Sequence, residues 1–114
     1  MVIRSFEDII AWQKSKELSQ MVYKKFGKCK DFSFRDQICR ASVSIMNNIA
    51  EGYERNGNKD FRNFLYISKG SAAEVRSMLD LALDFNYLSN DEYQVMRVLS
   101  IEISKLLSGF IKTL

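Results

Sequence analysis

Apolar residues recur every three or four positions through most of the chain, a spacing that predicts α-helices rather than strands. The connections between the periodic segments are only a few residues long, so sequential helices are expected to be antiparallel neighbours. The pattern therefore predicts an all-α, up-and-down antiparallel four-helix bundle with residues 1–114 in a single domain. The four expected helices cover about residues 6–26, 34–55, 59–85 and 90–114.

The expected helix ends carry capping signals. A serine followed three residues later by an acidic residue opens three of the helices, namely Ser5 with Asp8, Ser33 with Asp36, and Ser89 with Glu92. At the other ends, Gly27 is expected to close the first helix and Asn86 to cap the third with a left-handed backbone. An Asn-Gly-Asn turn at 56–58 separates the second helix from the third.

The third and fourth helices each present a single apolar face, which predicts one side buried in the bundle. Gly70 interrupts the third helix, where glycine costs about 0.8–1 kcal/mol relative to alanine, so we expect it to permit a close approach of a neighbouring helix. The expected core positions are Phe61, Phe64, Leu65, Ser68, Ala72, Val75, Leu79 and Ala82, with Met96, Leu99, Ile103, Leu106, Leu107 and Phe110.

The second helix is apolar over two adjacent faces. One face contains Ile38, Ala41, Ile45 and Ile49, and the other contains Cys39, Val43, Met46 and Ala50. Such a helix must be buried on more than one side, because wet apolar surface favours association. We therefore predict a homo-oligomer interface at this helix. An aspartate in place of Ile45 or Met46 is expected to give monomers or to unfold the chain.

Composition narrows the class of protein. The chain has 114 residues, no proline, and no uncharged run that approaches the ~20 apolar residues of a membrane span. Its two cysteines, Cys29 and Cys39, are too few for a disulfide framework, and no leader segment opens the sequence. We therefore expect a cytoplasmic protein with free thiols and no membrane helix.

Residue types argue against catalysis. The chain has no histidine, which excludes Ser-His-Asp and Cys-His nucleophile pairs and the Glu-x-x-His metal sites found in some helical bundles. Glu51 and Glu74 are expected to make structural ion pairs or caps, with Arg40 or Arg55 as partners. With no glycine-rich phosphate loop either, we expect no enzyme activity, no metal and no cofactor.

The basic residues are the only group of side chains in the sequence that suggests a ligand, namely the phosphates of nucleic acid. The net charge is +3, but it is uneven, because residues 24–40 carry six basic and two acidic residues. Clustered Lys and Arg bind phosphates without reading sequence, although an ordinary solvated face has a similar composition, and Asp80 and Asp84 dilute the charge of the third helix. The nucleic-acid-binding candidates are Lys24, Lys25, Lys28, Lys30, Arg35, Arg62, Lys69, Arg76, Arg97, Lys105 and Lys112. Arg62, Lys69 and Arg76 recur every seven residues on the expected exposed side of the third helix.

Two functions remain open from these residues alone. The first is a non-catalytic oligomer that binds RNA or DNA through its basic helix faces. The second is a protein–protein adaptor or assembly scaffold whose charge is incidental. Binding that weakens steeply with salt distinguishes the first from the second.

Three segments closely resemble the signature of the four-helix-bundle proteins encoded in intervening sequences of bacterial large-subunit ribosomal RNA genes. The longest is Gln-Ile-Cys-Arg-Ala-Ser-Val-Ser-Ile-Met-Asn-Asn-Ile-Ala-Glu-Gly at 37–52. The others are Phe-Glu-Asp-Ile at 6–9 with Trp12 and Gln13, and Phe-Leu-Tyr-Ile-Ser-Lys-Gly-Ser at 64–71 with Glu74.

The resemblance implies a homopentamer of four-helix bundles with the second helix near the subunit contacts. It also implies a relative, the accessory variability protein of diversity-generating retroelements, which binds nucleic acid and partners a reverse transcriptase. RNA, DNA and a reverse transcriptase are accordingly partners to consider. Arg40, Asn48, Glu51 and Gly52 match the signature, and we interpret them, with Ile45 and Met46, as structural or interfacial.

Overall fold

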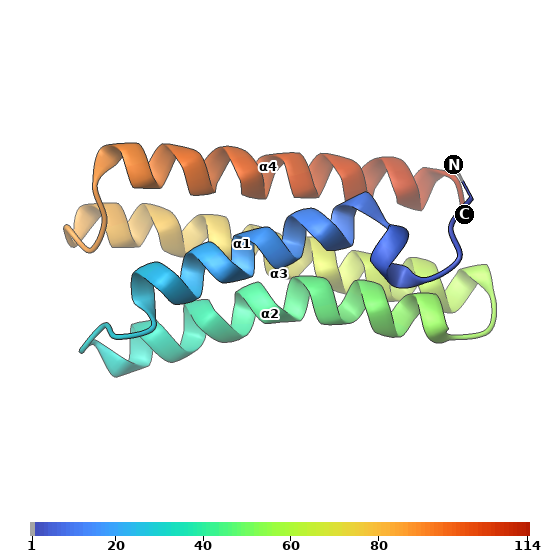
Figure 1. Cartoon of the computed structure of the whole chain (residues 1–114), viewed down its shortest axis with the longest axis horizontal. Coiled ribbons are helices and arrows are strands. Elements are labelled where there is room, and N and C mark those ends of the chain that lie inside the picture. The colour runs from blue at the N-terminus through green and yellow to red at the C-terminus, as the bar shows by residue number, and fades with distance from the viewer. Residues whose placement is uncertain (1) are drawn as a thin grey trace.

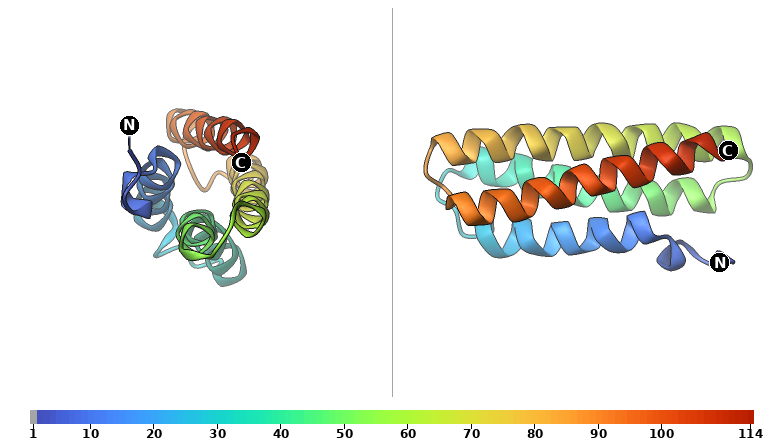
Figure 2. Two further views of the ribbon diagram at one scale, coloured as in Figure 1. Left: turned by 90° about the vertical axis from the view of Figure 1, so that its right-hand side faces the viewer. Right: turned by 90° about the horizontal axis from the view of Figure 1, so that it is seen from above.

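The computed structural model describes residues 2–114, which form four antiparallel helices in a bundle of 43 × 23 × 19 Å (Figure 1). No strand occurs in this part of the chain, so the predicted all-α four-helix architecture is confirmed. Seen end-on in Figure 2, the helices surround one core. The elements are a 3-10 turn η1 (Phe6–Asp8) and the helices α1 (Ile10–Phe26), α2 (Phe32–Glu54), α3 (Asn58–Asp84) and α4 (Asn90–Lys112).

Two of the predicted helix starts are wrong. The first helix does not begin at residue 6, because η1 is followed by the extended, buried Ile9, and Ser5 makes no side-chain cap. Asp8 instead accepts a hydrogen bond from the backbone N–H of Arg4 at 2.9 Å. The second helix begins earlier than predicted because Asp31, rather than Ser33, caps it by accepting from the backbone N–H of Phe34 at 3.2 Å.

Other end signals are confirmed. Ser89 and Glu92 form a reciprocal capping box at the start of α4. Asn86 has a φ of 60°, the left-handed backbone predicted after α3. The turn between α2 and α3 contains Gly57 with a φ of 101°, a conformation that side chains with a Cβ rarely adopt. Gly27 follows α1 with an ordinary right-handed backbone, and its N–H bonds to the carbonyl of Tyr23 at 2.8 Å.

All four helices contribute to the core, and most of the positions predicted on α3 and α4 are buried in it, with Phe64, Leu106 and Phe110 only half-buried. Serines allow close helix packing because their hydroxyls find backbone acceptors on the next helix. Ser19 of α1 donates to the carbonyl of Ser42 on α2 at 3.0 Å, and Ser68 of α3 donates to the carbonyl of Ile45 at 2.7 Å. The hydroxyls of the buried serines therefore all have hydrogen-bond partners.

The two apolar faces of α2 are buried to different extents. Ile38, Ala41, Ile45 and Ile49 lie in the core of the same chain, and Cys39 is also buried, whereas Val43, Met46 and Ala50 are half-buried. An aspartate at Ile45 would therefore place an unpaired charge in the bundle core and unfold the chain whether or not it associates. Met46 is the position at which the same change reports on an interface.

The close helix approach predicted at Gly70 occurs instead at Gly52. A Cβ added to Gly70 meets nothing within 4 Å, so the predicted close approach at this exposed residue is wrong. The close approach is at Gly52 of α2, where a Cβ would lie 2.6 Å from Phe64 Cβ and 3.1 Å from Phe61 Cδ1 of α3. Gly52 is thus a packing residue between α2 and α3.

These two glycines provide a matched pair of variants. Gly70→Ala should stabilise the fold by about 0.8–1 kcal/mol because it removes the helix-propensity cost of glycine without a clash. Gly52→Ala should destabilise it by about 1–3 kcal/mol because the methyl group overpacks against phenylalanine. Urea denaturation of both variants measures the difference, and a Gly52→Ala protein as stable as Gly70→Ala would contradict this packing.

Candidate nucleic-acid interface

The three heptad-spaced basic residues of α3 lie toward α4 rather than on its fully exposed side. Arg62, Lys69 and Arg76 are all half-buried. Arg62 Nη2 donates to the carbonyl oxygen of Leu114, just beyond α4, at 3.2 Å, while its Nε is buried without a partner in the described chain. The stripe therefore forms one wall of the groove between α3 and α4.

A hollow in this groove brings cations from both helices together. It has a volume of about 430 Å³ and is lined by Arg76 of α3 and by Lys105 and Lys112 of α4, of which the two lysines are exposed. Its remaining lining residues are Ile101, Ser104, Ser108 and Gly109. No acidic side chain lines it, so an anion there faces hydroxyls and positive charge. We name this hollow, together with the flanking Arg62, Lys69 and Arg97 of the same two helices, the α3–α4 basic groove; the cations that line the hollow itself are Arg76, Lys105 and Lys112.

Asp80, an acidic residue near one end of the groove, makes a hydrogen bond with Tyr93. The hydroxyl of Tyr93 on α4 donates to the Asp80 carboxylate on α3, and this hydrogen bond raises the pKa of Tyr93. Arg97 lies close enough to oppose that rise electrostatically. Asp80 therefore keeps its negative charge, but its carboxylate is held by a local contact between the two helices.

The basic residues of 24–40 do not form one continuous site. Lys25 Nζ lies 3.0 Å from Glu92 Oε2, and Arg35 Nε lies 2.8 Å from Asp36 Oδ1. Lys24, Lys28 and Lys30 are exposed and make no ion pair with any residue of 2–114. The predicted cluster therefore contributes three free cations at the end of the bundle where α1 turns into α2.

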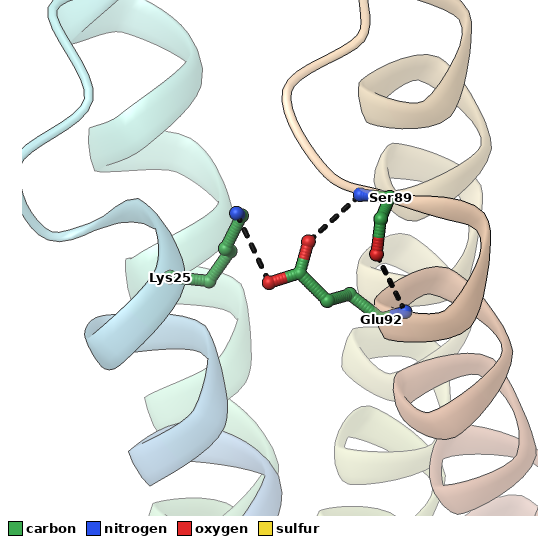
Figure 3. A network of polar contacts seen from close by, with 3 residues as sticks. All are labelled: Lys25, Ser89 and Glu92. Atoms are coloured by element: carbon green, nitrogen blue, oxygen red, sulfur yellow. Dashed lines mark hydrogen bonds and ion pairs between the residues drawn. The ribbon is translucent and has the colours of Figure 1, made fainter.

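Figure 3 shows how Lys25 is held by the capping box of α4. Glu92 Oε1 accepts from the Ser89 backbone N–H at 2.7 Å, while Ser89 Oγ accepts from the Glu92 N–H at 3.1 Å. The backbone hydrogen bond, followed by the contact with Lys25, lowers the pKa of Glu92 from its ordinary value of 4.5. Lys25 thus ties α1 to α4 instead of presenting a free charge.

The residues matching the signature act mainly within the chain. Asn48 Nδ2 donates to Ser44, to its carbonyl at 2.8 Å and to its hydroxyl at 2.9 Å. Glu51 pairs with Arg55 at 3.3 Å, one of the predicted pairings. Arg40 is exposed and lines a separate hollow of about 440 Å³ whose other lining residues are Tyr23, Val43, Ser44, Asn47 and Asn48.

The remaining reactive groups have structural partners. Glu74 accepts a long hydrogen bond from Gln37 Nε2 at 3.4 Å, and Glu51 is engaged with Arg55. Burial raises the pKa of the Cys39 thiol, which disfavours the nucleophilic thiolate. Within residues 2–114, no three His, Cys, Asp or Glu side chains are grouped to hold a metal ion, and no helix is long and apolar enough to cross a membrane.

The fold is that of a small all-α four-helix bundle, and its surface has a basic groove between α3 and α4. Residues 7–109 match the family described as 23S rRNA-intervening sequence protein, and the chain belongs to that family. A solved structure from Bacteroides thetaiotaomicron, described as a protein of unknown function from the S23 ribosomal protein family, is 32% identical. It matches 90% of this chain and 99% of its own with a TM-score of 0.84. No curated protein matches the chain.

Sequence reasoning found the cations of the groove but not how they group. It did not place the α3 stripe and the α4 lysines in one groove, and it did not single out Ser104 and Ser108, which lie beside the lysines in the same hollow. The available signal was the spacing of these serines four residues apart, which puts both on one side of α4. That spacing does not reveal which helix they face.

The Glu92 contacts predict a defined dependence of stability on pH. Because the folded-state pKa is lowered, Glu92 contributes stability that is present above about pH 4.5 and is lost as the pH falls through the folded value. Urea denaturation of the protein and of Glu92→Gln should therefore differ most at neutral pH and converge in acid. Lys25→Met, which keeps the capping box, should retain most of the pH dependence. A difference that does not change between pH 7 and pH 3 would contradict the assignment.

Proposed function

We propose that this protein is a non-catalytic, self-associating nucleic-acid-binding protein that holds the phosphate backbone in the α3–α4 basic groove. The observation that carries the proposal is the hollow in which Arg76 of α3 meets Lys105 and Lys112 of α4 with no acidic lining residue. Such a site is suited to phosphate oxygens because lysine supplies compact charge and arginine supplies a fork of donors.

The spacing of the cations suits an extended polyanion better than a single small anion. Lys105 and Lys112 are seven residues apart on α4, a rise of about 10 Å along the helix. One strand of duplex DNA advances about 3.4 Å per nucleotide, so on DNA this step corresponds to phosphates about three nucleotides apart. The same step separates Lys69 from Arg76 on α3. Affinity then comes from counterion release, with little reading of base sequence.

RNA is the first nucleic acid to consider because the family description refers to intervening sequences of 23S ribosomal RNA. Each groove offers only a few phosphate contacts, which gives weak binding for one chain. Self-association, with the homopentamer implied by the sequence resemblance as the specific form, would repeat the groove and raise the overall affinity through multivalency. The half-buried Val43, Met46 and Ala50 on α2 support such association.

The protein-adaptor alternative has one observation in its favour. Val95 and Val98 of α4 are 55% and 58% exposed, and Val95 lines a hollow between α1 and α4 together with Met21, Met96 and the charged Lys24, Lys25, Asp91 and Glu92. Exposed apolar side chains around a hollow are suited to a protein partner, and a reverse transcriptase is the candidate implied by the sequence resemblance. Binding through this surface would persist at high salt.

A double variant of the groove tests the proposal. Lys105→Gln with Lys112→Gln should weaken binding of labelled RNA and make the slope of log affinity against log salt shallower by about 1.5, because two phosphate contacts are lost. Fluorescence anisotropy over a salt series measures both effects, with the mass of the protein determined in the same buffer.

The matched control removes the same charge elsewhere. Lys16→Gln with Lys59→Gln alters two exposed lysines outside the groove and should leave most of the binding and its salt slope intact. Equal losses in the two double variants would indicate a general charge effect and contradict the groove. No RNA or DNA binding by the assembled wild-type protein at low salt would overturn the proposed function.

A further inference from the structure

One aromatic ring at the end of the bundle is exposed in an unusual setting. Phe32, the first residue of α2, is 60% exposed, which makes it the most exposed aromatic residue of 2–114. The Arg35 guanidinium carbon lies over this ring, 4.7 Å from its centroid, and Arg35 Nε is itself held by Asp36 at 2.8 Å. The Arg35 guanidinium therefore lies over the ring, yet the residue as a whole remains 60% exposed.

Free positive charge lies close to this ring along the chain. Lys28 and Lys30 precede Phe32 by four and two residues, so their Cα atoms lie within about 14 Å and 7 Å of its own. Both lysines are exposed and make no ion pair within the described chain. The intervening Asp31 keeps its negative charge, but its two carboxylate oxygens are held by the Phe34 N–H at 3.2 Å and the Tyr87 hydroxyl at 2.7 Å.

The segment that carries the ring is fixed to the core. Phe34 packs edge-on against Phe26 of α1 and against Tyr87 of the α3–α4 connection, with ring centroids 5.4 Å and 5.3 Å apart. The Cys29 N–H bonds to the Phe26 carbonyl at 2.9 Å, which tightens the turn between α1 and α2. Binding of a ligand to Phe32 therefore costs little conformational entropy, because the surrounding protein is already ordered.

We propose that Phe32 is a stacking platform for an unpaired base of single-stranded RNA, with Lys28 and Lys30 contacting the adjacent phosphates. The inference rests on the proposed nucleic-acid function and goes beyond it. It adds a second contact surface, and it specifies that the RNA bound there is single-stranded. An exposed aromatic ring beside backbone-binding cations is the combination that single-strand-binding proteins use, and every base offers a face to it. A paired base keeps its faces inside the duplex and cannot stack there.

A membrane surface fits this geometry less well than RNA does. Insertion of the Phe32 ring into lipid would carry the overlying Arg35 guanidinium, which is already paired with Asp36, away from water. A base stacked on the ring leaves that guanidinium in water and near phosphate. The charges around the ring thus favour a polyanion with flat, unpaired bases.

Three variants at one position separate stacking from apolar bulk. Phe32→Ala and Phe32→Leu should each weaken binding of a labelled single-stranded oligoribonucleotide by roughly tenfold, while affinity for an RNA duplex of the same length stays within about twofold. Phe32→Trp should retain single-strand affinity because it keeps an aromatic face. Circular dichroism of each variant should show an unchanged helical fold, since the ring is mostly exposed.

Several results would overturn the inference. One is a Phe32→Leu protein that binds single strands as tightly as the wild type, and another is an equal loss for single strands and duplex. A loss of binding to phosphatidylserine vesicles with RNA binding unchanged would assign the ring to a membrane instead. The groove variant tests the proposed function separately from the Phe32 inference. Lys105→Gln with Lys112→Gln should weaken the binding of single-stranded and duplex RNA alike. If that double variant binds normally while Phe32→Leu loses only single strands, the groove is wrong and the stacking platform stands.

Discussion

The close contact between α2 and α3 is the constraint on which the rest of the structure depends. Gly52 has no room for a side chain because Phe64 and Phe61 lie against its backbone. Along the same seam, Ser68 donates to the carbonyl of Ile45, and the hydroxyls of Ser44 and Ser71 lie 2.9 Å apart. Small and hydroxyl-bearing residues therefore set both the distance and the rotation of α3 relative to α2.

That rotation decides what the surface can bind. With one flank of α3 committed to α2, the opposite flank, which carries Arg62, Lys69 and Arg76, lies toward α4. Lys105 and Lys112 approach the same hollow from α4, and the nearby Asp80 is engaged by Tyr93. Charges that are unremarkable on isolated helices are thus gathered by packing into one groove, while Lys25 and Arg35 are withdrawn into local ion pairs.

The periodic pattern was sufficient to predict the number of helices, their approximate limits and most of the buried positions, because each depends on residues close in sequence. It failed where two neighbouring residues could each cap the same helix, and where residues distant in sequence come into contact. Asp31 takes the cap that Ser33 could have supplied, and a glycine's role depends on the opposing helix, which is why Gly70 was misassigned. The same limit applies to the basic residues, since spacing gives the face of a helix but not its partner. The role inferred for Phe32 depends on its position beside Arg35 and two unpaired lysines, which the pattern of apolar residues does not reveal.

The central claim is that packing of α3 against α4 creates the surface that holds nucleic acid. The most direct test is chemical footprinting of lysines in the assembled protein, with and without RNA, read by mass spectrometry. The account predicts that RNA protects Lys105 and Lys112 strongly while the exposed Lys16 and Lys59 remain reactive. Saturating RNA that leaves Lys105 and Lys112 as reactive as they are in the free protein would contradict it.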